Sequence, residues 1–320
     1  MSKKKADIKI VTYGGRIGWL LRKHFSFITS DLYLKWQYAI RKSLFKKYIA
    51  FFDQNFANGN ILNPCLISIE TINRCNSTCS FCPANKNSET RPFQKMSEEL
   101  FKKIILELKE MDYDGYLNLY VNNEPFIDNR IEDWYIYAHE QLPKAKMLLY
   151  TNGTLLTLDR FSKIIPVIDK CIINNYAEKL ELHDNLKDIL KIVNEDKKYW
   201  NKDITVQIRY IREILTNRAG VAPNKSKKVA NKMLCIMPFT DLTIYPNGTV
   251  GLCCSDALEK TNYGNIANES IRDVWSSVQY QNLRRIIGSN RADYPFCNGC
   301  DFVDAGIRNE FMKAIMKKGK

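Results

Sequence analysis

Short apolar runs alternate with helical patterns through the middle of the chain. Five runs rich in β-branched and apolar residues predict strands, at 66–70, 117–121, 147–150, 171–174 and 204–210. Apolar residues at helical spacing predict two of the helices between them, one at Phe101, Ile104, Ile105 and Leu108 and one at Ile189, Ile192 and Val193. The first of these helices is expected to begin after Ser97, which suits the capping position. Strand, helix and strand in this order predict a parallel sheet with ligands at the carboxyl ends of its strands.

The pattern changes after residue 225. Two alternating runs, 242–245 and 249–252, flank Asn247-Gly248, and Asn-Gly between such runs is a strong hairpin signal. Cys253 and Cys254 therefore follow a predicted hairpin strand. We expect a helical extension over residues 1–60, an α/β core over 61–225 and a cysteine-bearing part over 226–320.

Composition fits a globular chain of one large α/β domain and a smaller appendage. Of the 320 residues, 45% are hydrophobic and 26% are charged, close to the soluble average. No apolar run approaches the roughly 18 residues that cross a bilayer, and no signal-peptide pattern follows Met1. We therefore expect a cytoplasmic protein, in which ten cysteines serve as metal ligands, catalytic groups or core residues instead of disulfides.

Positive charge gathers at the beginning of the chain. Residues 1–50 hold twelve Lys or Arg against two Asp, while the whole chain has a net charge of +13. Nine aromatic residues are interleaved with this charge. Such a segment is typical of a helix on an anionic membrane surface, and equally of a basic helix packed on the enzyme body.

Three cysteines, Cys75, Cys79 and Cys82, which we call the first cysteine group, lie within eight residues after the first predicted strand. Three thiolates so close together can share one iron–sulfur cluster. Since no fourth cysteine is adjacent, one iron would remain open for catalysis. A zinc site is the alternative, although zinc sites usually pair two C-x-x-C units.

The segment from Cys75 to Cys82 resembles the loop of the radical S-adenosylmethionine superfamily, C-x-x-x-C-x-aromatic-C, with Phe81 in the aromatic place. The resemblance implies a partial (β/α)6 TIM-like barrel and a [4Fe-4S] cluster on these three cysteines. It also implies S-adenosyl-L-methionine on the open iron, cleaved to a 5′-deoxyadenosyl radical. The cofactor would then carry the difficult chemistry while the protein aims it.

Two further segments match cofactor contacts of that superfamily. Asn122-Asn123-Glu124-Pro125 resembles the Gly-Gly-Glu-Pro element that binds the methionine ammonium, with Asn122 and Asn123 in place of both glycines. The resemblance implies that Glu124 accepts from this ammonium and that Asn123 lies beside it. Thr151-Asn152-Gly153 resembles a segment near the ribose, although Thr-Asn-Gly alone is only a turn signal.

Four later cysteines, Cys235, Cys253, Cys297 and Cys300, form what we call the second cysteine group. Their spacing resembles the auxiliary-cluster region of the SPASM and twitch subgroup. Because no cysteine follows Cys300, the match is to the shorter twitch version, which implies one auxiliary [4Fe-4S] cluster. A structural zinc on the same cysteines is the alternative, and Cys254 could replace Cys253.

Together the two groups favour a two-electron oxidation, because a saturated cluster near a radical generator can accept a second electron. The substrate is expected to be a hydroxyl-bearing sugar or cyclitol, and flavodoxin or ferredoxin the electron donor. Arg218, soon after the fifth predicted strand, is the candidate catalytic residue, as a hydrogen-bonding orienter of substrate. The alternatives are a peptide maturase that forms thioethers or epimerises residues, and a zinc-holding nucleic-acid-binding protein, of which the latter is disfavoured.

Overall fold

The structure, a computed structural model, describes residues 7–12, 15–199, 202–226, 232–303 and 308–318. An eight-stranded sheet with the order β1-β6-β5-β4-β3-β2-β7-β8 forms its centre. The strands are β1 (Asp7–Thr12), β2 (Leu66–Ile69), β3 (Tyr116–Asn118), β4 (Lys146–Thr151), β5 (Lys170–Ala177), β6 (Asp203–Tyr210), β7 (Asp241–Ile244) and β8 (Val250–Gly251). Every neighbouring pair is parallel except β7 with β8, so the predicted α/β class with a parallel sheet is confirmed.

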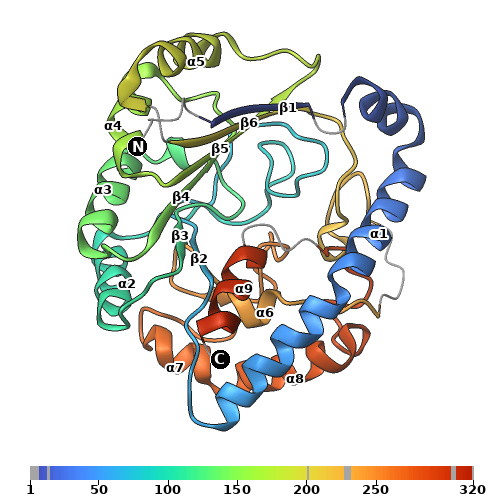
Figure 1. Cartoon of the computed structure of the whole chain (residues 1–320), viewed down its shortest axis with the longest axis vertical. Coiled ribbons are helices and arrows are strands. Elements are labelled where there is room, and N and C mark those ends of the chain that lie inside the picture. The colour runs from blue at the N-terminus through green and yellow to red at the C-terminus, as the bar shows by residue number, and fades with distance from the viewer. Residues whose placement is uncertain (1–6, 13–14, 200–201, 227–231, 304–307, 319–320) are drawn as a thin grey trace.

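Helices cover the outer side of this curved sheet (Figure 1). Those between the core strands are α2 (Glu98–Glu110), α3 (Ile131–Gln141), α4 (Leu158–Ile164) and α5 (Asp184–Glu195). The others are α1 (Gly15–Ala57), α6 (Met237–Thr240), α7 (Ile271–Ser276), α8 (Val278–Asn290) and α9 (Arg308–Lys318). The predicted start of α2 is confirmed, because Ser97 Oγ accepts from Leu100 N at 3.2 Å, and the four apolar residues predicted to share its inner face are buried.

The N-terminal segment, expected to be helical, also contains a strand. β1 pairs with β6 from Asp7 opposite Asp203 to Thr12 opposite Ile208, which extends the parallel sheet at that edge. The remainder of the segment is α1, as expected. The alternating run of residues 7–12 was hidden by the basic charge around it. No helix among the described residues is long and apolar enough to span a bilayer.

β3 ends earlier than the apolar run 117–121 predicts. After Asn118 the backbone bonds to side chains instead of to a neighbouring strand: Tyr135 Oη accepts from Leu119 N at 3.0 Å, and Asn123 Oδ1 accepts from Val121 N at 3.0 Å. The chain therefore leaves the sheet at residue 119 and turns across its carboxyl edge.

The predicted C-terminal hairpin is confirmed, and it continues the core sheet. β7 pairs in parallel with β2 from Leu66 opposite Asp241 to Ile69 opposite Ile244. β8 then runs back antiparallel to β7. Since the first cysteine group follows β2 and Cys253 follows β8, this pairing brings both cysteine groups to neighbouring parts of the molecule.

Candidate functional site

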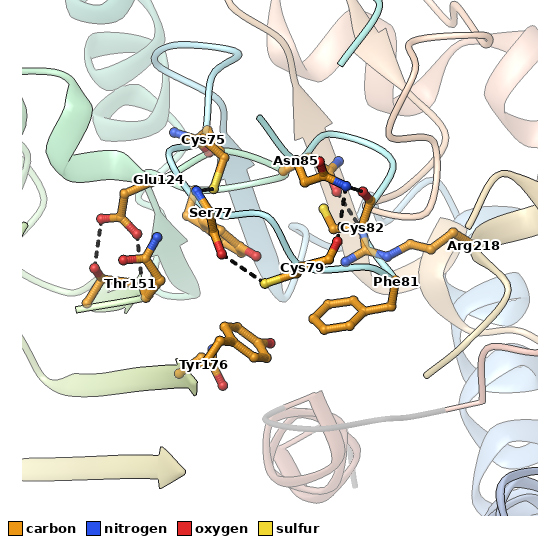
Figure 2. A pocket seen from close by; sticks show the side chains of 15 residues that line it. Cys75, Ser77, Cys79, Phe81, Cys82, Asn85, Glu124, Thr151, Tyr176 and Arg218 are labelled. Carbon is orange, nitrogen blue, oxygen red and sulfur yellow. Dashed lines mark hydrogen bonds between the residues drawn. The ribbon is translucent and has the colours of Figure 1, made fainter. Parts of the chain in front are cut away.

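A pocket opens among the loops that follow the carboxyl ends of β2 to β6 (Figure 2). Parallel sheets usually bind their ligands at this edge. The structure brings together in its lining nine of the residues predicted from the sequence: Cys75, Cys79, Phe81, Cys82, Asn123, Glu124, Thr151, Asn152 and Arg218. The other predicted residues, those of the second cysteine group, do not line this pocket.

The loop of the first cysteine group is held by short polar side chains. Ser77 N donates to Cys75 Sγ at 3.4 Å, and Ser77 Oγ lies 3.0 Å from Cys79 Sγ. Asn85 Nδ2 donates to the carbonyls of Cys79 and Cys82, at 3.0 and 2.6 Å. These bonds fix the backbone while all three thiols remain at the pocket (Figure 2).

Two thiols of this loop, Cys75 and Cys79, lie where a thiolate without a nearby cation is unfavourable. Burial raises the pKa of Cys75 to about 12 and that of Cys79 to about 11. Bound metal reverses this effect, because a coordinating thiol is deprotonated. Three thiols at one pocket thus suit a positively charged metal centre.

The arrangement differs from a site for a single ion. No three His, Cys, Asp or Glu side chains in the described parts of the chain converge closely enough to hold one metal ion. In an iron–sulfur cluster each thiolate binds its own iron, so the sulfur atoms are spaced more widely. The donor set of three soft thiolates therefore fits a cluster of several irons better than zinc.

Glu124 provides a buried carboxylate beside these thiols. Its oxygens accept from Thr151 Oγ1 at 2.7 Å, Asn152 N at 2.8 Å and Phe126 N at 3.2 Å. Burial nevertheless raises the pKa of Glu124 to about 7. Asn123 Nδ2 next to it is buried and has no hydrogen-bond partner among the described residues. A ligand with a cationic group and a hydrogen-bond acceptor, such as an amino acid moiety, would satisfy both.

A second buried carboxylate, Glu70, connects the loop of the first cysteine group with the segment after Cys254. It follows β2, and its oxygens accept from Asn122 N at 3.1 Å and Arg91 Nη1 at 2.8 Å. Arg91 also pairs with Glu89 at 2.8 Å and with Glu259 at 2.7 Å. Burial raises the pKa of Glu70 to about 7 despite Arg91. This ion network ties the loop of the first cysteine group to the segment after Cys254.

Arg218 reaches the pocket from η4 (Arg218–Gly220), a 3₁₀ turn after β6. Its Nη1 donates to Asn122 Oδ1 at 2.6 Å and to the Cys254 carbonyl at 3.0 Å. Asn122 Nδ2 donates to the same carbonyl at 3.2 Å. Arg218 is thus a fixed cation between the pocket and the region of the second cysteine group.

Sequence reasoning missed other residues of the lining, namely Ser77, Asn85, Tyr120, Asn174 and Tyr176. Asn174 and Tyr176 lie near the carboxyl end of β5, a position that is itself a signal for ligand-facing residues in a parallel sheet. Tyr176 packs on Phe81 with ring centroids 5.2 Å apart. No local signal marks Ser77 or Asn85, because their roles depend on loop geometry.

The second cysteine group is buried away from this pocket, and its members lie near one another. Burial raises the pKa of Cys253 well above its ordinary value, and the nearby thiols Cys254, Cys297, Cys235 and Cys300 raise it further. Burial also raises the pKa of Cys300. As in the first group, a metal centre would stabilise these thiols as thiolates.

Comparison with known proteins supports this description. Residues 69–216 match the model of the radical SAM superfamily, and residues 235–301 match that of SPASM, an iron–sulfur cluster-binding domain. The predicted resemblance to both is confirmed. These domains account for a [4Fe-4S] cluster with S-adenosyl-L-methionine and for auxiliary iron–sulfur binding.

Individual relatives cover most of the chain. It is 24% identical over 248 residues, 77% of this chain and 96% of the relative, to the S-adenosyl-L-methionine-dependent 2-deoxy-scyllo-inosamine dehydrogenase of Niallia circulans. The crystal structure of BtrN with AdoMet and 2-DOIA matches with a TM-score of 0.66 and 24% identity over 76% of this chain and 94% of that chain. Selenomethionine BtrN in an open conformation matches with a TM-score of 0.56 and 22% identity over the same shares. The fold is therefore shared with these structures.

Proposed function

We propose that this chain, which carries a radical SAM domain followed by an SPASM domain, oxidises a hydroxyl group of a small cyclitol or sugar by two electrons. The observation that carries the proposal is the position of Arg218, which lines the pocket of the first cysteine group and donates to the Cys254 carbonyl beside Cys253. A site able to accept an electron thus adjoins the place of hydrogen removal.

The first cysteine group would hold a [4Fe-4S] cluster with one open iron, and the second group an auxiliary [4Fe-4S] cluster. When bound, the first cluster and S-adenosyl-L-methionine supply a 5′-deoxyadenosyl radical. The Glu124 carboxylate would then accept from the methionine ammonium, and Asn123 Nδ2 would donate to the methionine carboxylate. Thr151 and Asn152, which line the same pocket, would contact the ribose, and Phe81 packs the cluster loop against Tyr176.

Arg218 would orient the substrate hydroxyl. Oxidation of a carbinol carbon to a carbonyl would pass one hydrogen atom to the 5′-deoxyadenosyl radical, the hydroxyl proton to solvent and one electron to the auxiliary cluster, so the product would be lighter by two mass units. Arginine is almost never deprotonated, so Arg218 donates hydrogen bonds to the substrate oxygen and does not take its proton. Its bond to Asn122 Oδ1 leaves other guanidinium N–H groups for this purpose.

A cyclitol or sugar is favoured over a peptide. The Niallia circulans relative is a dehydrogenase of 2-deoxy-scyllo-inosamine, and it aligns over 96% of its own length. A peptide maturase would usually carry a small winged-helix unit for the leader peptide. The described part of residues 1–60 consists of β1 and α1, which is not that pattern.

Anaerobic reconstitution tests the proposal. About eight irons per chain are expected for two four-iron clusters. With S-adenosyl-L-methionine, a one-electron reductant and 2-deoxy-scyllo-inosamine, mass spectrometry should detect 5′-deoxyadenosine and a product lighter by two mass units. Arg218→Ala should lower product while uncoupled deoxyadenosine persists. Stoichiometric zinc without iron, or full turnover by Arg218→Ala, would contradict the proposal.

The division of the chain and its partners complete the proposal. The matches at 69–216 and 235–301 support a core over 61–225 and an auxiliary domain over 226–320, behind a basic extension over 1–60. A flavodoxin or ferredoxin would supply electrons in the cytoplasm.

On α1, Trp36 and Ile40 are 59% and 58% exposed among lysines, which supports contact of residues 1–50 with an anionic membrane. Flotation with anionic liposomes, unchanged by Lys42→Glu and Lys46→Glu together, would contradict that contact.

A further inference from the structure

The turn that carries Arg218 has an unusual backbone. Arg218 and the following Ala219 both have positive φ, 49° and 54°, although neither is glycine. Left-handed conformations cost about 1–2 kcal/mol for each such residue. Two in succession persist only where the surrounding contacts hold them.

Asn217 supplies these contacts, and it makes them with the loop between two cysteines of the second group. Asn217 Nδ2 donates to the carbonyl of Gly299 at 2.7 Å, and Gly299 lies between Cys297 and Cys300. Asn217 N donates to Asp301 Oδ1 at 2.8 Å, and Asp301 N donates back to Asn217 Oδ1 at 3.3 Å.

The contact of Asn217 with Gly299 and Asp301 is shielded from water, and an ion pair with Lys225 holds Asp301 in place. Asn217 is only 2% exposed, so its bonds are made without competing solvent. Lys225 Nζ pairs with Asp301 Oδ2 at 2.8 Å, which holds the acceptor of the Asn217 N–H in place. The turn of Arg218 is thus anchored, through the backbone and side chain of Asn217, on Gly299 and Asp301 of the segment that holds Cys297 and Cys300.

The side chain of Arg218 extends from this anchored turn to the pocket of the first cysteine group. Its bonds to Asn122 Oδ1 and to the Cys254 carbonyl place the guanidinium at the pocket (Figure 2). A displacement of Gly299 or Asp301 would therefore move the base of Arg218, while Asn122 and Cys254 hold its tip.

We propose that Asn217 is a positioning residue that couples the ligand loop of the second cysteine group to Arg218. When the four thiolates of that group are bound to a cluster, the 297–300 loop is fixed, and Asn217 transmits that order to the guanidinium. The pocket is then completed only in a chain whose auxiliary site is assembled. This inference rests on the proposed function for the role of Arg218 toward substrate.

The coupling also has a consequence for the auxiliary cluster itself. The Arg218 guanidinium lies next to the carbonyl of Cys254, one residue from Cys253. A fixed positive charge favours the reduced, more negative state of a nearby cluster. Loss of this charge, or of its fixed position, should lower the reduction potential of the auxiliary cluster.

The test uses the reconstituted full chain with Asn217→Ala, Arg218→Ala and both together. Iron content, the auxiliary midpoint potential followed by electron paramagnetic resonance, and calorimetric binding of 2-deoxy-scyllo-inosamine with S-adenosyl-L-methionine are measured. Both single variants should lower the potential and raise the probe dissociation constant about tenfold or more, the usual effect of an outer contact. In the double variant Asn217→Ala should add nothing to Arg218→Ala, because it acts through that residue.

Three controls separate coupling from loss of structure. Asn217→Asp keeps an acceptor for Asp301 N and serves where Asn217→Ala does not load iron. Arg218→Lys keeps the charge and should retain most of the wild-type potential. Asn175→Ala removes an equally buried asparagine that bonds to Glu181 and His183, and it should leave the potential unchanged.

Additive effects of Asn217→Ala and Arg218→Ala, or an unchanged potential in both, would overturn the coupling. Uptake of only about four irons per chain by the wild type would overturn it as well. If the wild type does not bind the probe, the proposed substrate is wrong, while the potentials of the wild type and of the two single variants and the double variant still decide the coupling.

Discussion

Replacement of Glu124 by glutamine tests the cofactor site most directly. In the structure its two oxygens accept three hydrogen bonds, from Thr151 Oγ1, Asn152 N and Phe126 N. A glutamine has one oxygen and one NH₂ group in the same space. The amide nitrogen is best placed toward Thr151, whose hydroxyl can rotate and accept, while the amide oxygen keeps Asn152 N. Phe126 N then faces the amide nitrogen and loses its acceptor, since both sit on the Oε1 side.

Two magnitudes follow. A buried N–H without an acceptor costs about 1–3 kcal/mol. Glutamine also removes a buried charge that is unfavourable enough to raise the pKa of Glu124 to about 7, so the two effects oppose each other and the free energy of unfolding should fall by less than about 3 kcal/mol. Separately, a hydrogen bond to a charged group is worth about 1.5–3 kcal/mol, and the variant loses the charge that faces the methionine ammonium. The dissociation constant for S-adenosyl-L-methionine should therefore rise about 10- to 150-fold.

Anaerobic calorimetry with S-adenosyl-L-methionine measures the affinity, and urea unfolding measures the stability. Glu107→Gln is the matched control, because its carboxylate accepts from Ile271 N at 2.7 Å between α2 and α7, outside the pocket. It should weaken folding without changing affinity. An affinity of Glu124→Gln within twofold of the wild type, with all iron retained, would refute the placement of the ammonium at Glu124.

Three further predictions concern pH, the cysteine loop and the core. Because burial raises the pKa of Glu124 to about 7, its charge is lost as pH falls through 7, so wild-type affinity for S-adenosyl-L-methionine should weaken from pH 7.5 to 6 and Glu124→Gln should show no such change in calorimetry. Asn85→Ala removes the side-chain donor to the Cys79 and Cys82 carbonyls, although the backbone N–H of residue 85 still donates to Cys82, so about half of the iron should be lost to a chelator at least tenfold faster. Asn87→Ala, at an exposed neighbour, should match the wild type. Arg284→Ala removes the guanidinium that donates to the Pro238 and Trp275 carbonyls and lies 3.9 Å from the centroid of the Trp275 ring. The free energy of unfolding, measured in urea, should fall by about 3–5 kcal/mol. A fall of less than about 1 kcal/mol would contradict this account.

Local sequence predicted the elements well wherever one face of an element is buried. The helix after Ser97 was marked by its cap and its apolar spacing, and both depend only on neighbouring residues. The strand β1 was not predicted, because a short alternating run next to many lysines has no local feature that distinguishes it from a basic helix. Its pairing with β6 is a contact with residues about 200 positions away.

The sequence by itself determined the chemistry of this protein. Thiol spacing in the Cys75 to Cys82 loop and the carboxylate of Glu124 point to a radical SAM site because the required atoms lie on a few consecutive residues. Only the tertiary structure decided how the parts meet. The pairing of β7 with β2 brings the two cysteine groups to neighbouring parts of the molecule, and Asn217 reaches Gly299 across 82 positions of chain. Such contacts depend on the register of a sheet and on the packing of loops against it, and no local pattern of residues encodes either one.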